Sequence, residues 1–117
     1  MGEAEPTVST HVLDVERGRP AEGLRVLLYR RDGTGERLVG EGITDTDGRI
    51  PRLLTGSLVA GDYRLVFELA GAGVQAEGEA QPFFTRTSVE LRVTDAARSY
   101  HVPLLLAPYA LTMYRGS

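Results

Sequence analysis

Hydrophobic and polar residues alternate along most of this chain, with the two-residue period that is typical of β-strands. The alternation is clearest over residues 61–69, where every second residue from Tyr63 to Leu69 is apolar and Arg64 lies between two of them. Such a segment buries one face and leaves the other to solvent. The same pattern in weaker form predicts further strands at residues 8–14, 24–31, 37–44, 87–94 and 99–107.

Turn-forming residues separate these predicted strands. Gly, Pro and charged residues fill 16–23, and Asp-Gly pairs mark turns at 32–33 and 47–48. Residues 70–80 are the one place for a short helix, although their glycines weaken helix formation. Six or seven short strands with very little helix indicate an all-β fold, specifically an antiparallel β-sandwich.

Length, charge and hydropathy narrow the class of protein further. A chain of 117 residues makes one domain with its own core; we expect residues 1–7 to be a flexible N-terminus and 8–117 to be the folded domain. The net charge of −3 provides no basic field for nucleic acid. The longest apolar stretch, 102–111, is too short to span a bilayer, and no secretory signal is visible. We therefore expect a cytoplasmic protein without nucleic-acid or membrane partners.

The chain has no cysteine and only two histidines, His11 and His101. Disulfides, thiolate metal sites and cysteine nucleophiles are therefore impossible. A metal site would need carboxylates beside the histidines, and none has the ligand spacing of a helix. The Asp-x-Asp-Gly at 45–48 is a weak echo of a calcium loop, because the downstream glutamate of that motif is missing. We expect neither a metal ion nor a cofactor.

The alternating pattern places both histidines on the outer face of the predicted sandwich. His11 and His101 each alternate with core residues along their strands, so their side chains point away from the core. Their neighbours on this face include Leu13, Pro103 and Leu105, which are too apolar for an ordinary solvent-exposed face. Such a patch usually meets another subunit. The pattern leaves open whether the histidines form a site or are ordinary surface or interface residues.

Four motifs occur in order along the chain: "STHVLD" at 9–14, "TDGR" at 46–49, "YHVPLLLAPY" at 100–109 and "YRGS" at 114–117. Together they resemble the 5-hydroxyisourate hydrolases, the transthyretin-related enzymes of urate breakdown, over residues 8–117. The terminal motif is specific to that family, whereas "TDGR" alone would carry no weight. Ala107 and Met113 depart from the family, which commonly has Ser at the first position and Ser or Thr at the second. These departures concern details of the pocket.

The resemblance implies a transthyretin-like antiparallel β-sandwich of about seven or eight strands with one short helix. It also implies a homotetramer with active sites between subunits. The implied reaction is the hydrolytic ring opening of 5-hydroxyisourate to 2-oxo-4-hydroxy-4-carboxy-5-ureidoimidazoline, without a metal. The implied catalytic residues are His11, Arg49, His101 and Ser117, and the implied substrate-binding residues are His11, Arg49, Tyr114, Arg115 and Gly116.

These residue types suit such a reaction. Ring opening needs an activated water, hydrogen-bond donors for an oxyanion and a proton for the leaving nitrogen. A histidine with a pKa of about 6.5 exchanges protons near neutral pH, and an arginine offers paired donors to carbonyl and anionic oxygens. We expect His101 to activate water, with His11 as its partner, although the two could exchange roles. Arg49 would hold substrate and oxyanion, and Ser117 would contribute its hydroxyl and terminal carboxylate.

Two functions without catalysis are the alternatives. Transthyretin itself shares the expected fold and carries hydrophobic hormones, but a carrier needs neither two histidines and an arginine nor a terminal "YRGS". Prealbumin-like repeat modules of bacterial adhesins have similar strands, and this chain resembles them over 24–67. Many of those modules are locked by a lysine–asparagine isopeptide bond, which this chain lacks the residues to form.

Overall fold

The computed structural model describes residues 5–71, 78 and 81–116. Most of the segment 70–80, where the sequence predicts a short helix, lies outside these residues. The described residues contain no helix, and hence none that is long and apolar enough to cross a membrane. They form nine strands, two of which have only two residues: β1 (Val8–Asp14), β2 (Arg19–Pro20), β3 (Arg25–Asp32), β4 (Gly35–Ile43), β5 (Arg49–Ile50), β6 (Gly61–Glu68), β7 (Arg86–Val93), β8 (Tyr100–Ala107) and β9 (Ala110–Met113).

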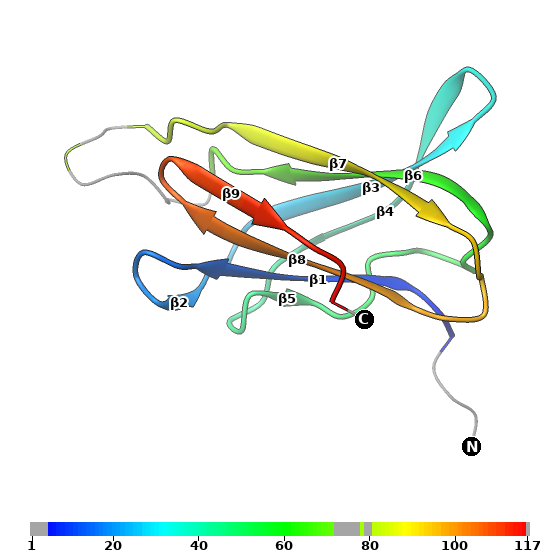
Figure 1. Cartoon of the computed structure of the whole chain (residues 1–117), viewed down its shortest axis with the longest axis horizontal. Helices are drawn as coiled ribbons and strands as arrows, with labels where there is room; N and C mark the ends of the chain where they lie inside the picture. Colours follow the sequence, from blue (N-terminus) through cyan, green and yellow to red (C-terminus); the bar gives the residue numbers. More distant parts are fainter. Residues whose placement is uncertain (1–4, 72–77, 79–80, 117) are drawn as a thin grey trace.

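The strands make two facing sheets (Figure 1). The first sheet has the order β2–β1–β8–β9, with the short β5 also paired to β1, and the second has the order β4–β3–β6–β7. The predicted β-sandwich is confirmed, and its strand pairs are antiparallel with one exception: β1 and β8 run parallel. A parallel pair needs a long connection, and here the whole second sheet separates the two strands along the chain.

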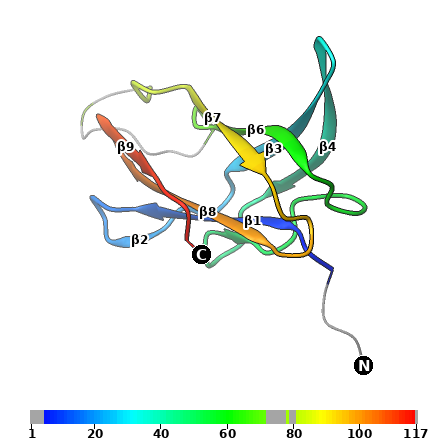
Figure 2. The same ribbon diagram turned by 45° about the vertical axis from the view of Figure 1, so that its right-hand side comes forward.

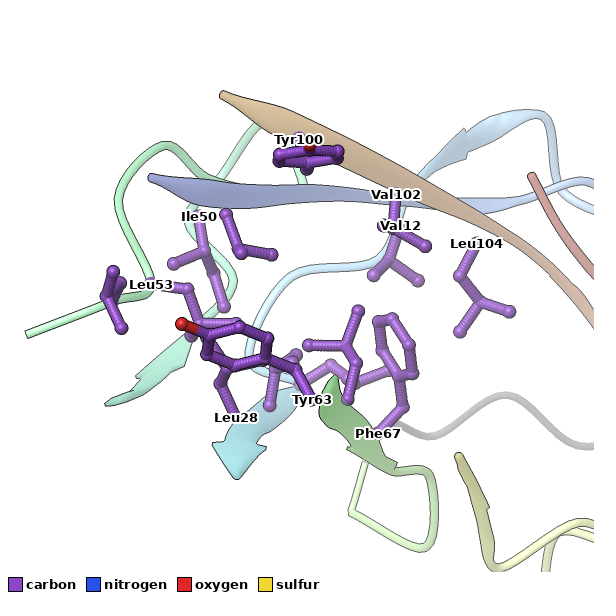
Figure 3. Packing of buried hydrophobic residues seen from close by; sticks show 14 of the residues in the cluster. Val12, Leu28, Ile50, Leu53, Tyr63, Phe67, Tyr100, Val102 and Leu104 are labelled. Carbon is purple, nitrogen blue, oxygen red and sulfur yellow. The ribbon is translucent and has the colours of Figure 1, made fainter. Parts of the chain in front are cut away.

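The core lies between the sheets, and its strand residues are mostly the alternate ones that the pattern predicts; Leu53, Leu54 and Leu58 join it from the segment between β5 and β6. Val12 of β1 and Val102 of β8 point into it from the first sheet, whereas Leu28 of β3 and Tyr63 and Phe67 of β6 point into it from the second (Figure 3). All five are buried. A slip of one residue would turn each of these side chains to solvent, so burial fixes the register of the strands. The same register determines which side chains point outward from the first sheet.

That outward face is less exposed than the sequence predicts. Leu13 and Leu105 are only partly exposed, and Pro103 is buried within the single chain. Pro103 lies opposite His11 of the neighbouring β1, and the chain that leaves β9 runs along its other side (Figures 1 and 2). The prediction of an exposed apolar patch is therefore wrong for Pro103 and holds in reduced form for the two leucines.

The last strand, β9, is absent from the sequence prediction. The chain reverses after Ala107 and returns antiparallel to β8, with Leu104 opposite Met113. Four residues are too few for alternation to be recognised. Because of this return, Tyr114 to Gly116 lie beside the first residues of β8 (Figure 2).

Packing also begins one residue before the predicted start of the domain at residue 8. Thr7 is buried, and its amide donates a hydrogen bond to Oγ of Ser99 at 3.0 Å. Its carbonyl accepts a hydrogen bond from the amide of Tyr100 at 2.9 Å. These two contacts join the chain before β1 to the start of β8, next to His101.

Candidate active site

Three of the predicted site residues come together on the outer face of the first sheet. His11 lies on β1, Arg49 on β5 and His101 on β8, and β1 is the middle strand of these three. His11 is directly opposite Arg49 in the β1–β5 pair. His101 is directly opposite Ser9, which shares the outer face of β1 with His11 because the two are two residues apart.

The turn before β5 fixes Arg49 through backbone contacts. The carboxylate oxygen Oδ1 of Asp45 accepts hydrogen bonds from the amides of Asp47 and Arg49, each at 2.9 Å. Gly48 has a φ of 74°, and its carbonyl accepts a hydrogen bond from the amide of Val12 at 2.8 Å. A Cβ atom on Gly48 would be 2.4 Å from the carbonyl oxygen of Val12, so only glycine fits. The "TDGR" motif thus attaches Arg49 to β1.

A hollow of about 320 Å³ opens beside Arg49 and His101, and His11 is not among the residues that line it. Its volume falls in the range of sites for small molecules. Among the described residues, no three His, Cys, Asp or Glu side chains lie together as metal ligands would. The polar side-chain groups at the hollow are instead the His101 imidazole, the Arg49 guanidinium and the Ser9 hydroxyl, because the Thr10 side chain is buried and its hydroxyl donates to the carbonyl of Val102. The lining residues are Ser9, Thr10, Arg49, Pro51 and His101.

The surroundings of His101 lower the pKa of its imidazole below 6.5. Partial burial has the largest effect, and the positive charge of Arg49 and then that of protonated His11 act in the same direction. All three disfavour the imidazolium form. His101 is therefore neutral at neutral pH, with a lone pair on one ring nitrogen that can accept a proton.

Ser9 holds the other side of this imidazole, and the sequence reasoning did not select it as a site residue. Its Oγ lies 2.8 Å from Nδ1 of His101, which is hydrogen-bond distance. In the sequence Ser9 is two residues before His11 and far from His101. Nothing local therefore marks it as a contact of His101. Only the pairing of β1 with β8, whose residues here are 92 apart in sequence, shows the contact.

Gly116 packs against the same histidine. Its amide donates a hydrogen bond to the carbonyl oxygen of His101 at 2.7 Å. A Cβ atom on Gly116 would lie 2.6 Å from Cδ2 of the His101 ring, a distance that real contacts do not reach. Glycine therefore lets the terminal segment lie directly on the imidazole. Ser117, the predicted source of a hydroxyl and carboxylate, lies outside the described residues.

Tyr114 and Arg115 face a different cavity from the one at His101. Both line a space between the two sheets, together with Met113 and Tyr100. The guanidinium of Arg115 lies over the Tyr100 ring, 4.9 Å from its centroid, which is cation–π distance. In the single chain Arg115 is thus placed to anchor the terminal segment, whereas Tyr114 is 52% exposed. Neither lines the hollow beside Arg49 and His101.

Known proteins resemble this chain in sequence and in fold. A family model described as the HIUase/Transthyretin family matches residues 8–116. The 5-hydroxyisourate hydrolase of Deinococcus radiodurans is 40% identical over 116 residues, which cover 96% of this chain and 97% of the relative. The solved structure of Klebsiella pneumoniae 5-hydroxyisourate hydrolase has a TM-score of 0.79 and 34% identity, over 96% of this chain and 99% of that one.

Sea bream transthyretin in complex with thyroxine has a nearly equal TM-score of 0.78, at 25% identity and over 92% of both chains. Fold similarity alone therefore does not separate the hydrolase from the hormone carrier. The family model and the relatives that align over nearly their full length confirm the resemblance seen in the four motifs. This chain belongs to the HIUase/Transthyretin family.

Proposed function

We propose that this protein hydrolyses 5-hydroxyisourate. The observation that carries the proposal is that the neutral imidazole of His101 and the guanidinium of Arg49 line one hollow. A proton acceptor beside a cationic hydrogen-bond donor suits the attack of water on a ring carbonyl. The relatives named 5-hydroxyisourate hydrolase supply the substrate, and they are more similar to this chain than the transthyretin is.

The residues at the hollow fit an ordered sequence of proton transfers. His101 accepts a proton from a water molecule as the water oxygen bonds to the ring carbonyl carbon. Arg49 donates hydrogen bonds to the carbonyl oxygen, which becomes an oxyanion. When the oxyanion collapses, the carbon–nitrogen bond breaks and His101 returns the proton to the leaving nitrogen. His11, opposite Arg49, is positioned to orient that guanidinium or to relay a proton.

We infer further that the active protein is a homotetramer whose subunits complete the site. In one chain the hollow is a surface feature, and its Arg49 is exposed. Leu13 and Leu105 on the same face keep apolar surface accessible to a partner. A second copy over this face would enclose the hollow and exclude bulk water, which strengthens the electrostatic contacts within it.

The test is a coupled assay in which urate oxidase produces 5-hydroxyisourate from urate and the protein is then added. We expect the substrate to disappear well above its spontaneous rate. His101→Ala and Arg49→Ala should each lower kcat/KM by at least about a hundredfold, the usual size of a lost proton-transfer or oxyanion group. Both side chains are on the surface of the sheet, so the variants should fold.

The matched control is Arg25→Ala. Arg25 is an exposed arginine on β3 of the second sheet and pairs with Glu41, away from the hollow. This variant should retain the wild-type rate, because exposed ion pairs contribute little. A folded wild-type protein that leaves the spontaneous decay unchanged would overturn the proposed function. A folded variant at His101 or Arg49 with the full rate would remove that residue from the mechanism.

A further inference from the structure

The imidazole of His101 is contacted on two of its edges by backbone-fixed neighbours. Nδ1 lies 2.8 Å from Oγ of Ser9. The Cγ–Cδ2 edge lies against Gly116, where there is no room for even a methyl group. Among the described residues, Nε2 has no hydrogen-bond partner. Cε1 and Nε2 are the ring atoms that remain, and Nε2 is the one that can exchange a proton with a substrate bound in the hollow that His101 lines.

The position of Ser9 is set by the sheet itself. β1 and β8 are paired over seven consecutive residues, and Ser9 is the residue opposite His101. Both side chains project from the outer face, so the hydroxyl meets the imidazole without any adjustment of the loops. Serine has a short side chain with few rotamers, and the contact is partly buried. The hydrogen bond is therefore part of the rigid scaffold.

A hydroxyl can donate or accept, so the contact alone allows either neutral tautomer of His101. The charge at the hollow decides between them. Arg49 lines the same hollow, and its positive charge favours a lone pair over an N–H group at the ring corner that faces it. The proton then resides on Nδ1, where the Ser9 oxygen can accept it.

We propose that Ser9 is a positioning residue: its Oγ accepts the Nδ1–H hydrogen bond of His101, which holds the Nε2 lone pair toward the hollow. The catalytic consequence rests on the proposed function, but the tautomer does not. With the proton on Nδ1, Nε2 is ready to take a proton from water. With the proton on Nε2, the same histidine would present a donor and could not act as the base.

The direct test is nitrogen NMR of the full chain labelled with ¹⁵N-histidine, at a pH near 8 where His101 is neutral. The chain has only two histidines, so His11→Gln assigns the His101 signals. We expect a pyrrole-type shift for Nδ1 and a pyridine-type shift for Nε2. A histidine side chain in water carries its proton mostly on Nε2, so Ser9→Ala should move the equilibrium toward that form. Ser9→Thr, which keeps the hydroxyl, should retain the wild-type tautomer.

The same variants give a kinetic readout. Ser9→Ala should lower kcat about tenfold, the equivalent of one hydrogen bond, with little change in KM, and Ser9→Thr should restore most of the rate. Ser88→Ala is the matched control, since Ser88 is an exposed serine on β7 of the second sheet. It should change neither the tautomer nor the rate.

The outcomes separate the two proposals. A wild-type spectrum with His101 protonated on Nε2 overturns the role of Ser9, whatever the activity. An unchanged tautomer in folded Ser9→Ala overturns it as well. If the wild-type protein has the Nδ1–H tautomer but does not speed the decay of 5-hydroxyisourate, the positioning contact stands and the proposed function fails. If Ser9→Ala does not fold, the spectra of the wild type and of Ser9→Thr still test which nitrogen of His101 carries the proton.

Discussion

His101 loses part of its hydration when the chain folds, and it gains Arg49 and His11 as cationic or potentially cationic neighbours. Each change disfavours the imidazolium, so the pKa in the folded protein lies below the ordinary value of 6.5. A base with a low pKa stays unprotonated, and hence competent, into mildly acidic solution. The same residue on an open surface strand would lose half of its active form near its ordinary pKa.

This shift predicts how the rate depends on pH. We expect kcat/KM to fall as the pH drops through the folded pKa of His101, with a midpoint below 6.5. Arg49→Gln removes one of the charges that lower this pKa, so the acid limb should move to higher pH. Burial has the larger effect and persists, so the pKa should return only part of the way.

The check is a pH–rate profile of wild type and Arg49→Gln, with the NMR titration of His101 beside it. Arg49→Gln will also have a lower plateau, because the oxyanion donor is lost, but the position of the limb is independent of the plateau. Arg25→Gln on the second sheet serves as the control and should leave the limb in place. An acid limb that stays where it was in Arg49→Gln would mean that another group controls it.

At the scale of strands, the sequence predicts a single strand from its local alternation but does not predict which distant strands pair. β6 was predictable because Tyr63, Leu65 and Phe67 alternate along it, even though Val66 between them is also apolar and buried. The outward direction of His11 and His101 followed from the same rule of alternation. β9 was not predictable, because four residues carry too little pattern. The contact of Ser9 with His101 depends on two strands that pair across 92 residues. No local signal encodes that pairing. The family motifs nevertheless indicated His11, Arg49 and His101, which the first sheet brings together.

β9 acts on the site through the residues that follow it. It returns the chain along β8, and the amide of Gly116 then continues the antiparallel pairing as far as the carbonyl of His101. Arg115 lies over Tyr100 on one side of this segment while Gly116 contacts His101 on the other. Tyr114 to Gly116 are therefore placed by strand geometry before any substrate is bound.

Gly116→Ala tests this placement. The new Cβ would lie 2.6 Å from Cδ2 of His101, so the ring or the terminal segment must move. A displacement of this kind should lower kcat/KM by about tenfold to a hundredfold. Because Gly116 is exposed and outside the core, we expect the free energy of unfolding to change by less than about 0.5 kcal/mol.

Gly35→Ala is the control for Gly116→Ala, since a Cβ atom at Gly35 meets nothing within 4 Å and its φ is not in the left-handed region. The two measurements are the hydrolysis rate and the midpoint of urea unfolding. A Gly116→Ala protein with wild-type activity would show that the terminal segment does not constrain His101. Equal losses of stability and activity would point to a general structural defect instead.

At the scale of the whole molecule, the two outer faces differ in chemistry. The outer face of the second sheet carries ion pairs between strands: Arg86 of β7 pairs with Glu68 of the adjacent β6, and Arg64 of β6 reaches across β3 to Glu36 of β4. Exposed pairs of this kind stabilise the fold little, but they are well solvated and oppose burial in an interface. The outer face of the first sheet instead carries partly exposed leucines and the hollow. If subunits assemble over either face, the first is the favoured one.

This asymmetry leads to the prediction for assembly. Light scattering should give a mass four times that of the 12.7 kDa chain, and Leu105→Arg should lower it, because a charge without a partner is costly to bury. Ile43→Arg is the matched control: Ile43 is 64% exposed on β4, at the edge of the second sheet, so this variant should keep the wild-type mass.

Loss of assembly in Leu105→Arg should also reduce the hydrolysis rate, because the hollow loses the subunit that encloses it. A wild-type mass of one chain at micromolar concentration, or a fully active single subunit, would rule out a site shared between subunits and would place all of the catalytic groups on the hollow of one chain.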